Sequence, residues 1–86
     1  MGSKNVRGVR FQCYSGDHAG ASIPHVHAHF NEGDVDIELL ADRSIRLSEQ
    51  HKADPHVKAN DVRKALRAAA AGYDDLLELW ENSRPS

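Results

Sequence analysis

Pro24-His25-Val26-His27-Ala28-His29-Phe30 is the stretch that decides the fold. It alternates between imidazole and apolar side chains, and successive side chains of a β-strand point to opposite faces. As a strand, it would place its three histidines on one face and turn Val26, Ala28 and Phe30 toward a core. A helix would scatter the histidines around its axis, so the pattern predicts a strand. The apolar face must then be covered, and any chemistry would lie on the histidine face.

The length and composition of the chain are those of one small domain, which we place at residues 4–83 with the first three residues set aside. Its 86 residues are 40% hydrophobic and 28% charged, enough for one modest core. The net charge of −2 creates no global attraction for nucleic acid, so anion binding would need a local patch. Cys13 is the single cysteine, which excludes an internal disulfide, and no apolar run approaches the ~20 residues of a membrane span. We therefore expect a cytoplasmic protein that has no membrane partner.

Three further strands are predicted around the histidine strand. Alternation over residues 6–14 indicates the first strand, and a loop rich in glycine and small polar residues follows at 15–23. A turn signal, Asn31-Glu32-Gly33-Asp34, leads into a strand at 35–40. The last predicted strand spans residues 44–48.

Burial restricts the register of the hairpin that contains the histidine strand, because a one-residue slip would put carboxylates into the core. We pair Phe30 with Val35, Ala28 with Ile37 and Val26 with Leu39. This register sets His29 opposite Asp36 and His27 opposite Glu38, and matching faces place Arg46 beside Glu38. The margin of this polar face would hold Arg10, Gln12 and Tyr14.

One long helix is predicted from Asn60 to the C-terminal tail. Its apolar stripe advances by three or four residues at each step and comprises Val62, Leu66, Ala69, Tyr73, Leu76 and Trp80. Gly72, within the predicted helix, would permit a bend. An isolated helix of this length is marginal, so the stripe must dock on the apolar face of the sheet. The predicted fold is α+β: an antiparallel four-stranded meander (β-β-β-β-α) covered on one face by one long C-terminal helix.

The histidine face has three interpretations, and the sequence leaves them open. Histidines two residues apart on a strand lie ~6.5–7 Å apart and can converge on one ion, so His25, His27 and His29 are candidate zinc ligands. A further metal ligand would come from Glu38, Asp36 or His18. Alternatively, a carboxylate opposite an imidazole fixes its tautomer and raises its pKa, as a general acid or base requires. In the third interpretation the face is merely solvated, and each pair stabilises the sheet by a few tenths of a kcal/mol.

Cleavage of a phosphodiester without a metal needs a base, an acid and a cation near the developing negative charge. The predicted face supplies all three types of group. The candidate catalytic residues are His25 and His27 as acid and base, Glu38 to orient His27, and Arg46 or Arg10 as the cation. A ribonuclease or a nucleotide-directed hydrolase would use such a set.

The string from His25 to Phe30 resembles the histidine-triad pattern of nucleotide hydrolases and transferases, His-φ-His-φ-His-φ-φ. Asn31 stands where that pattern wants a second hydrophobic residue. The motif also comes early in this chain, whereas in that family it lies near the end of a longer domain.

A second resemblance covers residues 9–82. Its motifs are Phe11-Gln-Cys-Tyr14, Pro24-His25-Val26-His27, an acidic hairpin, and a helix ending Leu76-Leu77-Glu78-Leu79-Trp80-Glu81. Together they resemble the small bacterial domain-of-unknown-function family 4160. His25 and His27 match the family motif, whereas His29 is an addition. Some members resemble halves of toxin–antitoxin pairs, which implies a toxin-like protein with a small antitoxin-like partner protein, or that partner itself. The histidine face would let a toxin-like protein act on RNA or nucleotides.

The charge order along the predicted helix opposes its macrodipole, which favours acids first and bases last. The bases of the first half are Lys58, Arg63, Lys64 and Arg67, and the acids of the second half are Asp74, Asp75, Glu78 and Glu81. Either these charges lie on a solvated face, or a partner complements them. An antiparallel copy of the helix would complement both halves, which would give a homodimer through the C-terminal helix. Two function classes stay open: a nucleic-acid- or nucleotide-directed enzyme, and a non-catalytic interaction module that binds a partner protein.

Overall fold

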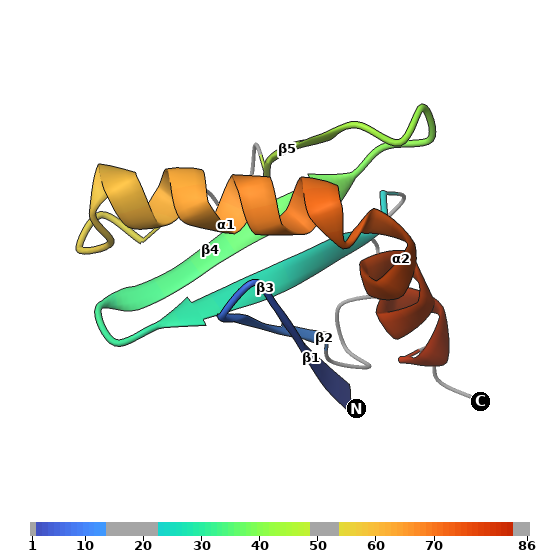
Figure 1. Cartoon of the computed structure of the whole chain (residues 1–86), viewed down its shortest axis with the longest axis horizontal. Coiled ribbons are helices and arrows are strands. Elements are labelled where there is room, and N and C mark those ends of the chain that lie inside the picture. The colour runs from blue at the N-terminus through green and yellow to red at the C-terminus, as the bar shows by residue number, and fades with distance from the viewer. Residues whose placement is uncertain (1, 14–22, 49–53, 84–86) are drawn as a thin grey trace.

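The structure, a computed structural model, describes residues 2–13, 23–48 and 54–83. These residues form an antiparallel sheet with strand order β1-β2-β3-β4-β5 and two helices that pack on it (Figure 1). The elements are β1 (Gly2–Val6), β2 (Val9–Cys13), β3 (His25–Phe30), β4 (Gly33–Leu39), β5 (Ile45–Leu47), α1 (Ala59–Ala71) and α2 (Tyr73–Asn82). The α+β class and the antiparallel meander are confirmed. The predicted count of four strands and one long helix is wrong, since the described residues contain five strands and two helices. Neither described helix is long and apolar enough to cross a bilayer.

The additional strand comes from a hairpin at the start of the chain. The single strand predicted at 6–14 is instead divided at Arg7-Gly8, where Val6 pairs with Val9 across a two-residue loop. Arg7 and Gly8 have φ values of 50° and 80°, the pair of positive φ angles that a type I′ turn requires. Gly8 is therefore a residue of the turn between two strands. Residues 2 and 3, which we had set aside, belong to β1.

The β3–β4 hairpin keeps the predicted faces but not the predicted register. Phe30 pairs with Gly33 across the two-residue turn Asn31-Glu32, so every pair is displaced by two residues from the prediction. A displacement of two returns each side chain to the same face, and burial therefore cannot distinguish the two registers. The observed histidine–acid pairs are His25–Glu38, His27–Asp36 and His29–Asp34.

The predicted long helix breaks at Gly72, where φ is −106° and ψ is 25°. A Cβ atom at this position would lie 2.8 Å from Cγ2 and 2.9 Å from Cγ1 of Val6, so any other residue at the break would require Val6 of β1 to shift. Figure 1 shows α1 running across the sheet and α2 turning away from its direction. The bend was foreseen at Gly72, but two separate helices were not.

The core lies between the apolar face of the sheet and the two helices. The largest fully buried side chains include Phe11, Ile37, Leu39 and Leu76. In α1 the buried residues are the alanines at 65, 68 and 69, whereas Val62 and Leu66 of the predicted stripe are only partly buried. In α2 the predicted stripe residues Tyr73, Leu76 and Trp80 are buried together with Leu79.

The start of α2 is tied to the turn between β4 and β5. The Tyr73 hydroxyl donates to the carbonyl of Leu40, and the Arg43 guanidinium lies 5.1 Å from the centroid of the Tyr73 ring. Arg43 also forms a two-pronged ion pair with Asp74, with Nη1–Oδ1 at 2.7 Å and Nη2–Oδ2 at 2.8 Å. This hydrogen bond holds the pKa of Asp74 below its ordinary value.

The break at Gly72 also changes where the acidic residues lie relative to the helix dipole. Asp74 and Asp75 now lie in the first turn of α2, where acids interact favourably with the helix dipole. The predicted opposition between charge order and dipole therefore does not hold for these two acids. The homodimer through the C-terminal helix stays a prediction, and its partner surface would be a bent pair of helices.

A side chain at Gly33 is expected to destabilise the protein. Its φ is +149°, and a Cβ atom would lie 2.5 Å from Cγ of Asp54. We expect Gly33→Ala to lower the free energy of unfolding by about 1–3 kcal/mol, the usual cost of such a backbone conformation outside glycine. Urea denaturation measures this as a shifted midpoint with an unchanged slope.

Gly8→Asn is the control for Gly33→Ala, because Gly8 also has a positive φ but a Cβ there would meet nothing within 4 Å. Asparagine tolerates the left-handed region, so this variant should lose much less stability. Equal midpoints for Gly33→Ala and the wild type would contradict the assignment of strain to Gly33.

Candidate functional site

The polar face of the sheet is organised in three cross-strand rows, each with a histidine of β3 directly opposite an acid of β4. The rows are His25–Glu38, His27–Asp36 and His29–Asp34. β2 extends two of them, since Gln12 lies opposite His27 and Arg10 opposite His29. Arg46 of β5 lies opposite Glu38 and extends the third. The period of two in β3 and the short turn that follows it produce this arrangement together.

The middle row contains the more buried of two similar histidine–aspartate pairs. His27 Nδ1 lies 2.7 Å from Asp36 Oδ1, and the two side chains are only 15% and 12% exposed. An ionised carboxylate can only accept hydrogen bonds, so Nδ1 donates and the tautomer of His27 is fixed. The backbone at Asp36 is also held, because the Ser48 amide donates to the Asp36 carbonyl at 2.9 Å. His27 and Asp36 are thus an oriented imidazole–carboxylate pair.

The neighbouring row repeats the same contact in a more exposed setting. His29 Nδ1 lies 2.7 Å from Asp34 Oδ1, but the side chains are 24% and 52% exposed. Water competes more strongly for both groups here, so the pair contributes less to stability. His29 and Asp34 therefore provide a natural comparison for His27 and Asp36.

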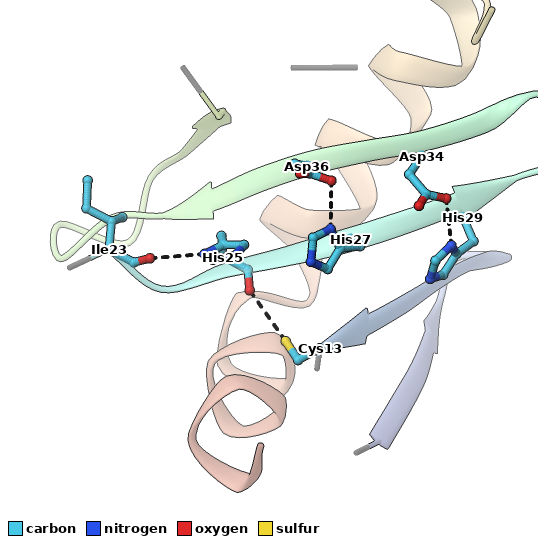
Figure 2. A network of polar contacts seen from close by, with 7 residues as sticks. All are labelled: Cys13, Ile23, His25, His27, His29, Asp34 and Asp36. Atoms are coloured by element: carbon cyan, nitrogen blue, oxygen red, sulfur yellow. Dashed lines mark hydrogen bonds and ion pairs between the residues drawn. The ribbon is translucent and has the colours of Figure 1, made fainter. Parts of the chain in front are cut away.

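His25 is held between α2 and His27. Its ring centroid lies 4.9 Å from that of Trp80 and 5.5 Å from that of His27, which it meets edge-on at 86°. Its Nδ1 lies 3.3 Å from the Ile23 carbonyl, and its own carbonyl accepts from Cys13 Sγ at 3.4 Å (Figure 2). The first histidine is thus fixed by packing and backbone contacts, and the other two are fixed by carboxylates.

A family model for a domain of unknown function (DUF4160) matches residues 8–81, from the turn before β2 to the last residue but one of α2. The chain belongs to this family. No curated protein and no solved structure gives a significant match. The matched DUF4160 region contains all three rows, and in it the Pro-His-Val-His strand meets the tryptophan of the last helix through the contact of His25 with Trp80.

Within this DUF4160 domain, the role predicted for Glu38 falls to another residue. Glu38 was expected to orient His27, but Asp36 does so, and Glu38 accepts a 2.6 Å hydrogen bond from Arg46 Nε. The predicted pairing of Arg46 with Glu38 is confirmed. The expected placement of His29 opposite Asp36 is wrong, because His29 pairs with Asp34.

The sequence contained a signal for the observed register. Both registers bury the same apolar residues, but the two-residue turn places an acid opposite all three histidines, whereas the predicted register provided only two such pairs. Opposite charges directly across a sheet are favourable, so the number of such pairs would have selected the observed register. Nothing comparable in the sequence indicates that Trp80 contacts His25.

The structure gives no support to a zinc site at His25, His27 and His29. Among the described residues, no group of three or more histidine, cysteine, aspartate or glutamate side chains is arranged to hold a metal ion. Each imidazole directs Nδ1 at an oxygen of the protein. His18, the other suggested ligand, and Tyr14, placed at the margin of the face, lie outside the described residues.

Proposed function

We propose that this DUF4160 domain is the toxin-like member of a two-protein pair and acts on RNA by acid–base chemistry at the histidine face. The observation that carries the proposal is the 2.7 Å contact between His27 and Asp36, two mostly buried side chains on a polar sheet face. A carboxylate that fixes the tautomer of an imidazole also raises its basicity, which suits a general base near neutral pH. A histidine–aspartate pair that served only a solvated surface would not need to be buried in this way.

RNA fits this set of residues because its 2′-hydroxyl supplies the nucleophile. In the proposed reaction His27 takes the proton of the 2′-hydroxyl, the 2′-oxygen attacks phosphorus, and the bond from phosphorus to O5′ breaks. Protonated His25, whose ring centroid lies 5.5 Å from that of His27, donates its proton to O5′. The products are a 2′,3′-cyclic phosphate and a 5′-hydroxyl, so atoms and protons balance. Asp36 stabilises the imidazolium that forms on His27.

Expression of variants in a bacterial host tests this function. Wild type is expected to arrest growth and deplete RNA, and His27→Asn should reduce RNA cleavage by about 10²–10⁴-fold, the usual contribution of a general acid or base. His29→Asn is the matched control, because it removes an equivalent contact from the exposed row. Its activity should stay close to that of the wild type, and the melting temperatures of all three proteins verify that they are folded.

Two results would contradict the enzyme proposal. One is a wild type that neither arrests growth nor cleaves RNA when no partner is present to neutralise it. The other is an equal loss of cleavage in His27→Asn and His29→Asn, because a general base at His27 predicts a difference between the two rows.

A non-catalytic interaction module is the second candidate, and the pairing of Arg46 favours it. Arg46 Nε lies 2.6 Å from Glu38 Oε1, and Glu38 is only 14% exposed, so the cation first assigned to phosphate is already neutralised. A compensated ion pair of this kind on the face suits an interface with a small antitoxin-like protein. Calorimetric titration with the product of the adjacent gene measures partner binding, which both candidates predict, so RNA cleavage separates the two functions. A module should bind this partner equally well as the wild type and as His27→Asn, with no RNA cleavage by either.

A further inference from the structure

We propose that the β2 side of the histidine face carries a subsite for a phosphate group of single-stranded RNA, with Arg10 as its cation. The inference rests on the function proposed above and names the side of the face from which the substrate approaches. It follows from the placement of charges, the direction of the imidazole rings and the cross-strand register.

The charges on this face are separated by strand. All three acids of the rows, Asp34, Asp36 and Glu38, lie on β4. Of the two arginines in the rows, Arg46 is neutralised by Glu38, whereas Arg10 on β2 is exposed and joins no ion pair with any described residue. A phosphate would be repelled by the β4 side and attracted to the β2 side, with the histidines between them.

The direction of the imidazole rings agrees with this separation of charge between β4 and β2. His27 and His29 both turn Nδ1 toward β4 to meet their aspartates, and Figure 2 shows the second nitrogen of each ring on the side away from β4. The nitrogen that would exchange a proton with the substrate, Nε2, is thus directed toward the β2 side. The proton-transfer atoms and the cation therefore share one side of β3.

The register brings Arg10 within reach of a group bound at His27. Arg10 is directly opposite His29 and diagonal to His27. Diagonal neighbours on antiparallel strands lie about 7–8 Å apart, a gap that a long side chain and one phosphate can fill. A guanidinium also matches the geometry of phosphate with two parallel hydrogen bonds.

Binding of a 2′-O-methyl hexanucleotide tests the subsite without chemistry, because this probe lacks the free 2′-hydroxyl that the proposed cleavage needs. We expect the wild type to bind it and Arg10→Gln to weaken binding by about 10-fold, as the loss of one charge-assisted contact implies. The slope of log affinity against log salt should fall by about 0.7, the value for one phosphate contact on a single strand. Inorganic phosphate in excess should compete with the probe for the wild type.

Arg67→Gln is the matched control, because Arg67 is exposed on α1, the helix that covers the opposite, apolar face of the sheet. It changes net charge by the same amount and should leave affinity and salt slope unaltered. The proposal is overturned if the wild type does not bind the probe, if Arg10→Gln binds as tightly as the wild type, or if Arg67→Gln weakens binding equally.

Cleavage of the unmodified RNA hexamer separates this inference from the proposed function. If the wild type cleaves and Arg10→Gln binds and cleaves equally well, the subsite is wrong and the function stands. If the wild type binds through Arg10 without cleaving, the enzymatic function is wrong and the phosphate subsite stands.

Discussion

Leu76→Asp is expected to unfold the protein. Leu76 is fully buried in α2, so the substitution removes a core side chain and leaves an unpaired carboxylate in its place. Loss of a buried leucine side chain alone costs about 2–5 kcal/mol, and burial of an unpaired charge adds several more. A domain of 86 residues has a total stability of about 4–13 kcal/mol. Circular dichroism should therefore show loss of helix and no cooperative thermal transition.

Three variants test the cause of that unfolding. Leu76→Met conserves volume and should cost less than about 1.5 kcal/mol. Ala70→Asp introduces the same carboxylate at an exposed position of α1 and should cost about 1 kcal/mol through helix propensity and the helix dipole. Leu66→Asp should be milder than Leu76→Asp, because Leu66 is only partly buried. A cooperative transition near the wild-type temperature for Leu76→Asp would contradict the core assignment.

Removal of Asp36 is expected to destabilise the protein far more than removal of Asp34, although both carboxylates hold a histidine at 2.7 Å. Asp36→Ala leaves the buried Nδ1 donor of His27 without its acceptor, which costs about 1–3 kcal/mol. Asp34→Ala breaks an exposed pair, whose contribution is about 0–1 kcal/mol. Urea denaturation of the two variants measures the difference. Equal midpoints for both would show that burial does not distinguish the two rows.

A double variant separates stability from function at the same pair. Replacing both His27 and Asp36 by leucine removes donor and acceptor together, and apolar replacement of a buried polar pair is often neutral or stabilising. We therefore expect the double variant to be at least as stable as Asp36→Ala and to be inactive on RNA. Such a result would indicate that the pair is present for its chemistry.

The sequence by itself determined the properties that follow from the spacing of apolar side chains, every second residue in a strand and every three or four residues in a helix. Alternation in Pro24–Phe30 was enough to predict the strand, the common face of its three histidines and the burial of Val26 and Ala28, all of which the structure confirms. The helical stripe predicted the burial of Tyr73, Leu76 and Trp80, and the quoted motifs indicated the family. Each of these features is local, because it follows from side-chain order along one segment.

Tertiary structure decided the features that depend on distance between segments. The alternation of faces is unchanged when the register shifts by two residues. The length of the turn after Phe30 therefore decided that Asp36, and not Glu38, is the partner of His27. The close approach of Val6 to Gly72 accompanies the division of the helix, and α2 then brings Trp80 against His25. The last two contacts join residues far apart in the chain, and local propensity contains no term for them. The pattern of side chains thus selected the faces, whereas packing between elements selected which residues on those faces meet.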